Sequence, residues 1–177
     1  MPFICQAPLQ TEENWKLHEE SCEEAALLQT YLYETGQTMS KEEANIEILK
    51  MIQWQQGTFG GHFDLKLEEM LTFIKGYYGL LDENITVVEN ATVEDIREAL
   101  NEGHPVIAPV TSSLLNNPYY PYPGYHMLAI TGLTKEYIIT NDNGTRRGGN
   151  YTYKIETFIE ALKDGGGFII TLKIPQS

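Results

Sequence analysis

The spacing of apolar residues changes part-way along the chain. In the first hundred residues it follows the period of an amphipathic helix and predicts helices over 22–34, 41–57, 67–76 and 93–100, with a strand at 85–88 between the last two. Later apolar residues form short runs, which predict strands at 105–110, 126–133, 137–141 and 168–174 and a helix at 155–162. Helices followed by mainly antiparallel strands indicate an α+β fold, and we expect one domain over residues 1–177.

Three of the predicted helices begin at a capping-box signature, in which a hydroxyl residue is followed three positions later by an acid. The pairs are Ser21 with Glu24, Ser40 with Glu43, and Thr92 with Asp95. Glycines after the apolar runs predict where the helices end. The first of these signatures puts Cys22 at the first position of a helix.

The net charge of −13 limits the choice of partners. Nucleic-acid binding needs a basic footprint, and anionic membrane surfaces attract basic segments, so both are disfavoured. No apolar stretch approaches the roughly 20 residues of a membrane span, so we expect no membrane insertion. A peptide or protein substrate fits this charge, with a weak preference for basic substrates through electrostatic steering. Nothing in the sequence predicts an oligomeric state.

The compartment depends on whether Met1 is the natural start. The first residues lack the basic and apolar blocks of a secretory signal, which predicts a cytoplasmic protein if the chain begins there. An excised mature domain would leave an extracellular location open. Two cysteines do not make a disulfide scaffold, and a Cys5–Cys22 bridge is the less favoured alternative because disulfides mark cysteine-dense secreted chains.

Cys22 is the candidate nucleophile. Unpaired backbone N–H groups and the positive end of the helix dipole favour an anion at a helix N-terminus, so a thiol there shifts toward thiolate, the form that attacks carbon. The alternative is a small buried residue that opens a core helix. The acids around it, Glu19, Glu20, Glu23 and Glu24, raise the pKa of a nearby thiol, so a base close in space is required.

His126 is the candidate base, because it alone among the four histidines opens an apolar strand directly after a loop. The next strand ends in Asn141 and Asp142. In an antiparallel pair joined by a tight turn the start of one strand lies beside the end of the next, so one of these residues can orient the imidazole. The alternatives are a partly buried structural histidine and ordinary turn residues.

An acyl-transfer site also needs donors for an oxyanion. The backbone N–H of Cys22 is one, and Gln6, Gln10 and Asn14 are candidates for a second. The sequence has no serine elbow, phosphate-binding loop, dinucleotide fingerprint or metal-ligand spacing, so we expect no cofactor and no metal. The aromatic stretch with Tyr119, Tyr122 and Tyr125 is either a substrate-binding wall or a rigid surface loop.

The sequence resembles the papain-like cysteine peptidases and, more closely, the C39-like peptidase domains, relatives of the bacteriocin-processing domains of bacterial exporters. The resemblance spans nearly the whole chain. It rests on the segments 2–8, 21–26, 125–128, 139–148 and 150–151 and on Trp15; these segments include Ser-Cys-Glu-Glu-Ala-Ala and Asn-Asp-Asn-Gly-Thr-Arg-Arg-Gly. It implies a papain-like fold, in which a helical part with the cysteine packs on a sheet that carries the histidine and the acid.

The resemblance also implies roles for individual residues. Cys22 would be the nucleophile, His126 the base, Asp142 its orienting partner, and Gln6 part of the oxyanion hole. Two positions depart from the family pattern. Asn143 replaces a frequent proline, which predicts a less rigid loop, and Glu23 replaces the glycine of the exporter domains, which argues against their double-glycine leader specificity.

We therefore expect a thiol hydrolase, most simply a peptidase that cleaves an amide bond with Cys22, His126 and Asp142. The same residues could carry out amide transfer or isopeptide cleavage, which the triad does not distinguish. A non-catalytic peptide-binding module on the same fold is the alternative from a different class, because the acids around Cys22 would keep its thiol protonated.

Overall fold

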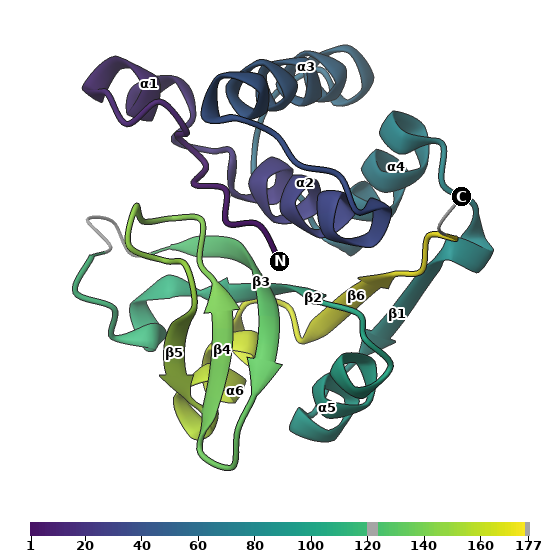
Figure 1. The fold of residues 1–177 in the computed structure, drawn as a ribbon, viewed down its shortest axis with the longest axis vertical. Coiled ribbons are helices and arrows are strands. Elements are labelled where there is room, and N and C mark those ends of the chain that lie inside the picture. The colour runs from purple at the N-terminus through teal and green to yellow at the C-terminus, as the bar shows by residue number, and fades with distance from the viewer. Residues whose placement is uncertain (120–123, 176–177) are drawn as a thin grey trace.

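A computed structural model describes residues 1–119 and 124–175, in which six strands form one antiparallel sheet and helices cover both faces (Figure 1). The strands are β1 (Ile85–Glu89), β2 (Val106–Thr111), β3 (Tyr125–Leu133), β4 (Tyr137–Asn141), β5 (Tyr151–Lys154) and β6 (Phe168–Leu172). Their order in the sheet is β1-β6-β2-β3-β4-β5. The α-helices are α1 (Glu12–Leu17), α2 (Cys22–Thr35), α3 (Lys41–Phe59), α4 (Leu67–Tyr78), α5 (Val93–Asn101) and α6 (Ile155–Asp164). The predicted helical part on an antiparallel sheet is confirmed.

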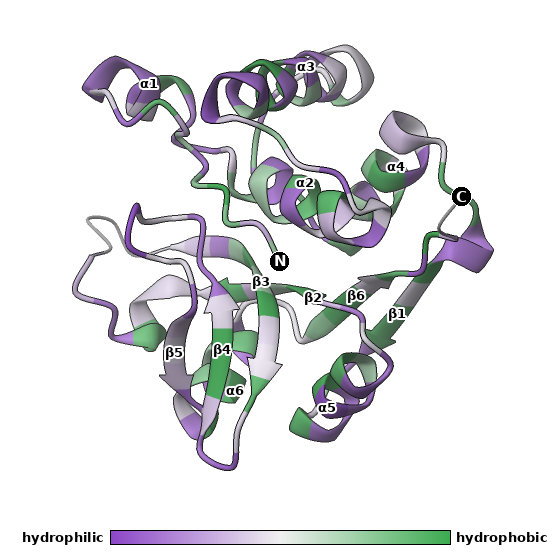
Figure 2. Ribbon diagram, in the orientation of Figure 1, coloured by the Kyte–Doolittle hydropathy of each residue, from purple (hydrophilic) through white to green (hydrophobic). Residues whose placement is uncertain are grey.

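The core lies in two layers, one on each face of the sheet. Alternate residues of a strand point to opposite faces, so Ile107 and Met127 pack with α2, α3 and α4, whereas Val106 and Leu128 pack with α5 and α6. Figure 2 shows β6 as a mostly apolar strand, and all its residues are buried, the pattern of a strand covered on both sides. The sheet is therefore packed on both faces, and α2 lies on one of them.

The predicted capping boxes hold at two of the three helices. Ser40 with Glu43 and Thr92 with Asp95 make both reciprocal hydrogen bonds. The box predicted at Ser21 is wrong, because Ser21 makes no side-chain cap and Glu24 turns away to partners on other segments. Glu24 Oε1 accepts from Gln55 Nε2 at 2.6 Å and lies 2.9 Å from His62 Nε2. Cys22 nevertheless opens the helix, as expected.

Other boundaries differ where packing outweighs local signals. Helix α3 continues through Gly57 and α4 through Gly76, each to an αL glycine further on. Gly76 lies inside α4, and the absence of a side chain there makes room for the indole of Trp54, which a Cβ would overlap. Helix α1 and strand β5 were not predicted, since each is short and lies in a polar stretch. Among the residues that the structure describes, no helix is long and apolar enough to cross a membrane.

Strands β3 and β4 separate at one end, and this separation positions the site. Their pairing begins at Ala129 with Asn141, so the first four residues of β3 pair with β2 on one side and have no β4 partner on the other. The N-terminal end of α2 occupies this opening. Gln29 Nε2 donates to the backbone oxygen of Asn141 at 3.1 Å, which joins α2 to the end of β4.

Gly148 allows the loop after β4 to close on itself. The backbone N–H of Asp142 donates to the carbonyl of Gly148 at 2.9 Å, and a Cβ at Gly148 would overlap the backbone carbonyl of Asp142. We expect Gly148→Ala to lower the free energy of unfolding by about 1–3 kcal/mol or more through overpacking. Gly57→Ala is the matched control, because its Cβ meets open space in α3 and should stabilise the helix by about 0.5–1 kcal/mol. Denaturant unfolding measures both, and equal effects of the two substitutions would contradict this account of the loop.

Candidate active site

Cys22 lies at the tip of α2, in the opening between β3 and β4. Its residue surface is 5% exposed, and its thiol donates to Glu23 Oε2 at 3.1 Å. The backbone N–H of Met127 donates to the sulfur. Because Met127 follows His126, this hydrogen bond places the thiol beside the start of β3. Cys5 and Cys22 are both free thiols, so the alternative disulfide does not form in this structure.

His126, near the start of β3, is paired with Asp142, directly after β4. His126 Nε2 lies 3.0 Å from Asp142 Oδ1, and both side chains are buried. A carboxylate accepts, so this contact makes Nε2 the protonated nitrogen and Nδ1 the basic one in the neutral ring. The structure therefore brings together the sequence-predicted histidine and acid, and it selects Asp142 over Asn141 as the neighbour of the ring.

Asp142 has a set of donors that suits a buried carboxylate. The Tyr153 hydroxyl donates to Oδ2, the backbone N–H of Gly144 to Oδ1 at 3.3 Å, and Asn117 Nδ2 lies 3.5 Å from Oδ2. Asn117 also donates to the Tyr153 hydroxyl at 2.7 Å. Buried charges require such partners, and these fix the carboxylate behind the imidazole. Sequence reasoning missed Tyr153 and Asn117, although Tyr151-Thr-Tyr153 after a glycine loop is the alternation of a short strand.

Gln6 is close to the turn that leads into Cys22, but its amide is occupied. Gln6 Nε2 donates to the backbone oxygens of His18 at 2.9 Å and Glu19 at 2.8 Å. An amide has two N–H groups, so both are used to hold this turn. The backbone N–H of Gln6 donates to Asn143 at 3.0 Å, which fixes the N-terminal segment against the loop after β4. The oxyanion role of Gln6 stays a prediction.

Glu23 holds the segment before α4 next to the Cys22 thiol through a hydrogen bond. Its Oε1 accepts the backbone N–H of Leu65 at 2.8 Å, and the carbonyl of Leu65 accepts from the Tyr125 hydroxyl at 2.7 Å. Asp64, which precedes Leu65 in this segment, is exposed; from the sequence we interpret it, together with His62, as one of a pair of loop residues rather than a metal ligand. The ligand atoms of Cys22, Glu23 and Asp64 lie within 4.8 Å of one another, so these residues could hold a metal ion.

The surroundings of Cys22 favour the protonated thiol. Burial raises the pKa of Cys22 well above its usual value, and the Glu23 carboxylate raises it further. Burial likewise raises the pKa of Glu23 well above that of an ordinary glutamate, and the charge of Glu24 adds to it. At this position burial and the neighbouring acid oppose the effect of the helix N-terminus on the thiol.

The three tyrosines of the predicted substrate wall do not share one environment. Tyr119 is exposed, and its hydroxyl accepts from Arg147 Nη1 at 3.2 Å, while the guanidinium lies 5.0 Å from the ring centroid. Tyr125 is half-buried beside Cys22 and Glu23. Burial raises the pKa of the Tyr125 hydroxyl, and these two acidic neighbours raise it further. Tyr122 lies outside the described residues. A substrate-binding role for these residues stays a prediction.

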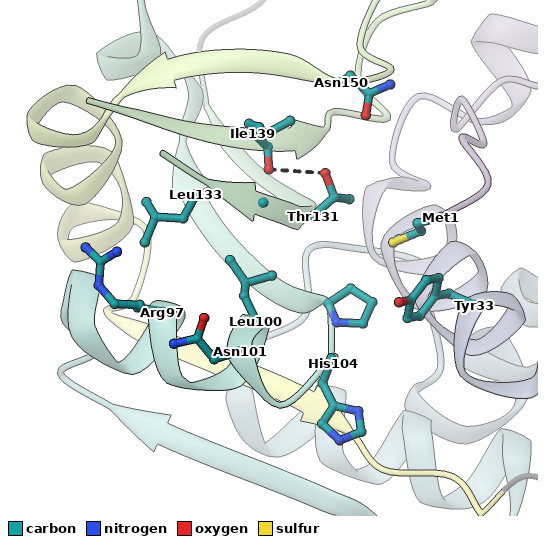
Figure 3. Close-up of a pocket in the computed structure, with 13 residues that line it drawn as sticks. Met1, Tyr33, Arg97, Leu100, Asn101, His104, Thr131, Leu133, Ile139 and Asn150 are labelled. Atoms are coloured by element: carbon teal, nitrogen blue, oxygen red, sulfur yellow. Dashed lines mark hydrogen bonds between the residues drawn. The ribbon is translucent and has the colours of Figure 1, made fainter. Parts of the chain in front are cut away.

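A cavity of about 480 Å³ lies at the opposite end of β3 and is separate from this site (Figure 3). The end of α5 and residues Thr131–Leu133 line it, and no cysteine does. His104 at its edge is paired with the buried Glu34, at 3.0 Å between Nδ1 and Oε1. That pair joins the residues before β2 to α2, and we assign it a structural role.

The sequence of residues 3–164 matches the model of the Peptidase_C39 like family. The chain belongs to this C39-like family. The resemblance found in the sequence is thereby confirmed, and it supports a peptidase at the level of the family.

A solved structure gives the same architecture. The C39-like chain superposes on the crystal structure of a protein assigned as a C39-like peptidase from Bacillus anthracis with a TM-score of 0.69 at 15% sequence identity. The match covers 99% of this chain and 96% of the other. At this identity the likeness establishes the fold, and the expected fold class is confirmed. A search of curated protein sequences finds no match.

Glu23→Gln tests how the neighbouring carboxyl controls the thiol. Glutamine keeps an acceptor for Leu65, removes the negative charge and can donate to sulfur, so the apparent pKa of Cys22 should fall. The measurement is the pH dependence of alkylation by iodoacetamide, followed by mass spectrometry at Cys22. Glu19→Gln, at an exposed acid, is the control and should leave the profile in place. An unchanged profile in Glu23→Gln would contradict this account.

Proposed function

We propose that the protein is a thiol hydrolase, a cysteine peptidase that cleaves amide bonds with Cys22, His126 and Asp142. The observation that carries the proposal is the buried His126–Asp142 pair at 3.0 Å, one residue from the backbone N–H that bonds the Cys22 sulfur. A histidine held by a carboxylate beside a thiol at a helix tip is the arrangement of nucleophile, base and orienting group that acyl transfer requires. Membership of a peptidase family supports the same reaction.

The reaction runs through a thioester. His126 Nδ1 takes the thiol proton as the Cys22 sulfur attacks the substrate carbonyl carbon, and the carbonyl π electrons move to oxygen. Collapse of this tetrahedral intermediate breaks the carbon–nitrogen bond, and His126 gives its proton to the leaving amine. Water then attacks the thioester with His126 again as the base. The thiol leaves with that proton, and the carboxylic acid product is released.

The N-terminal end of α2 would supply the first hydrogen-bond donor to the oxyanion. The N–H groups in the first turn of a helix have no partner within the helix, so that of Cys22 is suited to the developing charge. Gln6 would supply the second donor by redirecting one of the N–H groups that it gives to His18 and Glu19. Its side chain is 4% exposed, and its backbone is already fixed beside the loop that follows Asp142.

One observation favours a second candidate function, a peptide-binding module without catalysis. The pKa of Cys22 is raised by burial and by Glu23, and a protonated thiol is a poor nucleophile. The hydrolase needs proton transfer to His126 during attack, whereas the binding module does not. Reaction with an acyl donor distinguishes the two.

A thiol-directed acyl probe, an activated thioester of a short peptide, should label Cys22 in the wild-type protein at neutral pH. We expect Cys22→Ala to abolish the label and His126→Ala to reduce it by about 10²-fold or more, the scale of general base catalysis. Intact-protein mass spectrometry measures the acyl adduct, and circular dichroism checks that each variant is folded.

Cys5→Ala is the matched control, since Cys5 is the other free and buried cysteine. Its removal should leave labelling unchanged. Equal labelling of wild type and Cys22→Ala would rule out the nucleophile. A folded wild type that takes no acyl group, while iodoacetamide still alkylates Cys22, would favour the binding module.

A further inference from the structure

Asn143 follows the orienting acid Asp142 and is fully buried, with hydrogen bonds to two distant segments. Its side-chain Nδ2 donates to the backbone carbonyl of Cys22 at 2.9 Å, and its own backbone carbonyl accepts the N–H of Gln6 at 3.0 Å. Hydrogen bonds therefore join Asn143 to Cys22 and to the N-terminal segment, and Asp142 precedes it in the chain. The sequence predicted only a less rigid loop here, because proline is frequent at this position in the family.

The hydrogen bonding of Asn143 is one-sided. Its Oδ1 is buried and has no hydrogen-bond partner among the described residues, whereas Nδ2 is engaged. Buried polar atoms nearly always have a hydrogen-bond partner. An asparagine whose buried oxygen has none therefore indicates that the hydrogen bond donated by Nδ2 is the one that this position requires. The carbonyl it serves belongs to the first residue of α2, and movement of that residue moves the sulfur.

We propose that Asn143 is a positioning residue, which holds the tip of α2 at a fixed distance from the loop that carries Asp142 and thus holds the Cys22 sulfur toward His126. The inference rests on the proposed thiol hydrolase and adds a residue to it. Asn143 acts by connecting two segments that lie 121 positions apart in the chain, and a shift on the order of 1 Å between reacting groups can lower a rate by about a hundredfold.

Asn141 provides a matched control on the other side of Asp142. It is also buried, and its Nδ2 donates to a backbone carbonyl, that of Pro2, at the same distance of 2.9 Å. Asn143→Ala removes one side-chain hydrogen bond, that to Cys22. Asn141→Ala removes the bond to Pro2 and a longer one, of 3.3 Å, that its Oδ1 accepts from the backbone N–H of Asn150. Only Asn143→Ala removes a hydrogen bond to Cys22, the proposed nucleophile.

The test compares the two variants with wild type in kcat and KM for hydrolysis of an activated peptidyl thioester, alongside thermal unfolding. We expect both variants to lose thermal stability, Asn141→Ala at least as much as Asn143→Ala because it loses one more hydrogen bond. Only Asn143→Ala should lose kcat, by at least about tenfold, with KM within about twofold, because binding is kept and alignment is lost. Unchanged kcat in Asn143→Ala, or an equal loss in Asn141→Ala, would overturn the proposal. If Asn143→Ala does not fold, Asn143→Leu replaces it, since leucine is similar in size, adds no charge and has no hydrogen-bond donor.

Alkylation separates this inference from the proposed function. The rate constant for modification of Cys22 by iodoacetamide at fixed pH requires no hydrolysis. It should fall at least about fivefold in Asn143→Ala and remain near wild type in Asn141→Ala. If wild type hydrolyses nothing but this difference is present, the proposed function fails and the positioning role stands. If the two variants react alike, the positioning role fails whatever the hydrolysis shows.

Discussion

The site depends on a gap in the sheet. Strands β3 and β4 pair only from Ala129 and Asn141 onward, which leaves the backbone of Met127 without a strand partner on that side. Unpaired backbone N–H groups are costly when buried, and here the Cys22 sulfur at the tip of α2 accepts that of Met127. The sheet therefore needs the helix at this point. The sulfur thus lies beside Met127, the residue that follows His126.

Two carboxylates act on this site in opposite ways. Asp142 is buried among donors from Tyr153, Gly144 and Asn117, so it is suited to hold His126 in the form with Nδ1 as a base. Glu23 is equally buried, but one of its oxygens faces the thiol and a second acid, Glu24, follows it in the chain. Glu23 fixes the segment at Leu65 at the cost of a less acidic thiol. In the proposed reaction, transfer of the thiol proton to His126 therefore accompanies the attack of the sulfur.

Much of this arrangement was predictable because its signals are local or follow from strand pairing. The start of α2 at Cys22, and the neighbourhood of His126 and Asp142, follow from helix patterning and antiparallel geometry. The roles of Tyr153, Asn117 and Asn143 were not predictable, because each depends on contacts 11 to 121 residues away in the chain. The Ser21 capping box failed for the same reason. Gln55 and His62 on other segments offer Glu24 better partners than the first turn of its own helix does.

The most direct test of the central claim, that these residues form a working amide hydrolase, is cleavage of a broad proteome-derived peptide library, read by mass spectrometry of new termini. The account predicts that catalytic amounts of the wild-type protein generate a defined set of new termini, and that Cys22→Ala and His126→Ala, although folded, generate none. A folded wild-type protein that leaves the library intact, or a Cys22→Ala variant that produces the same termini, would contradict it.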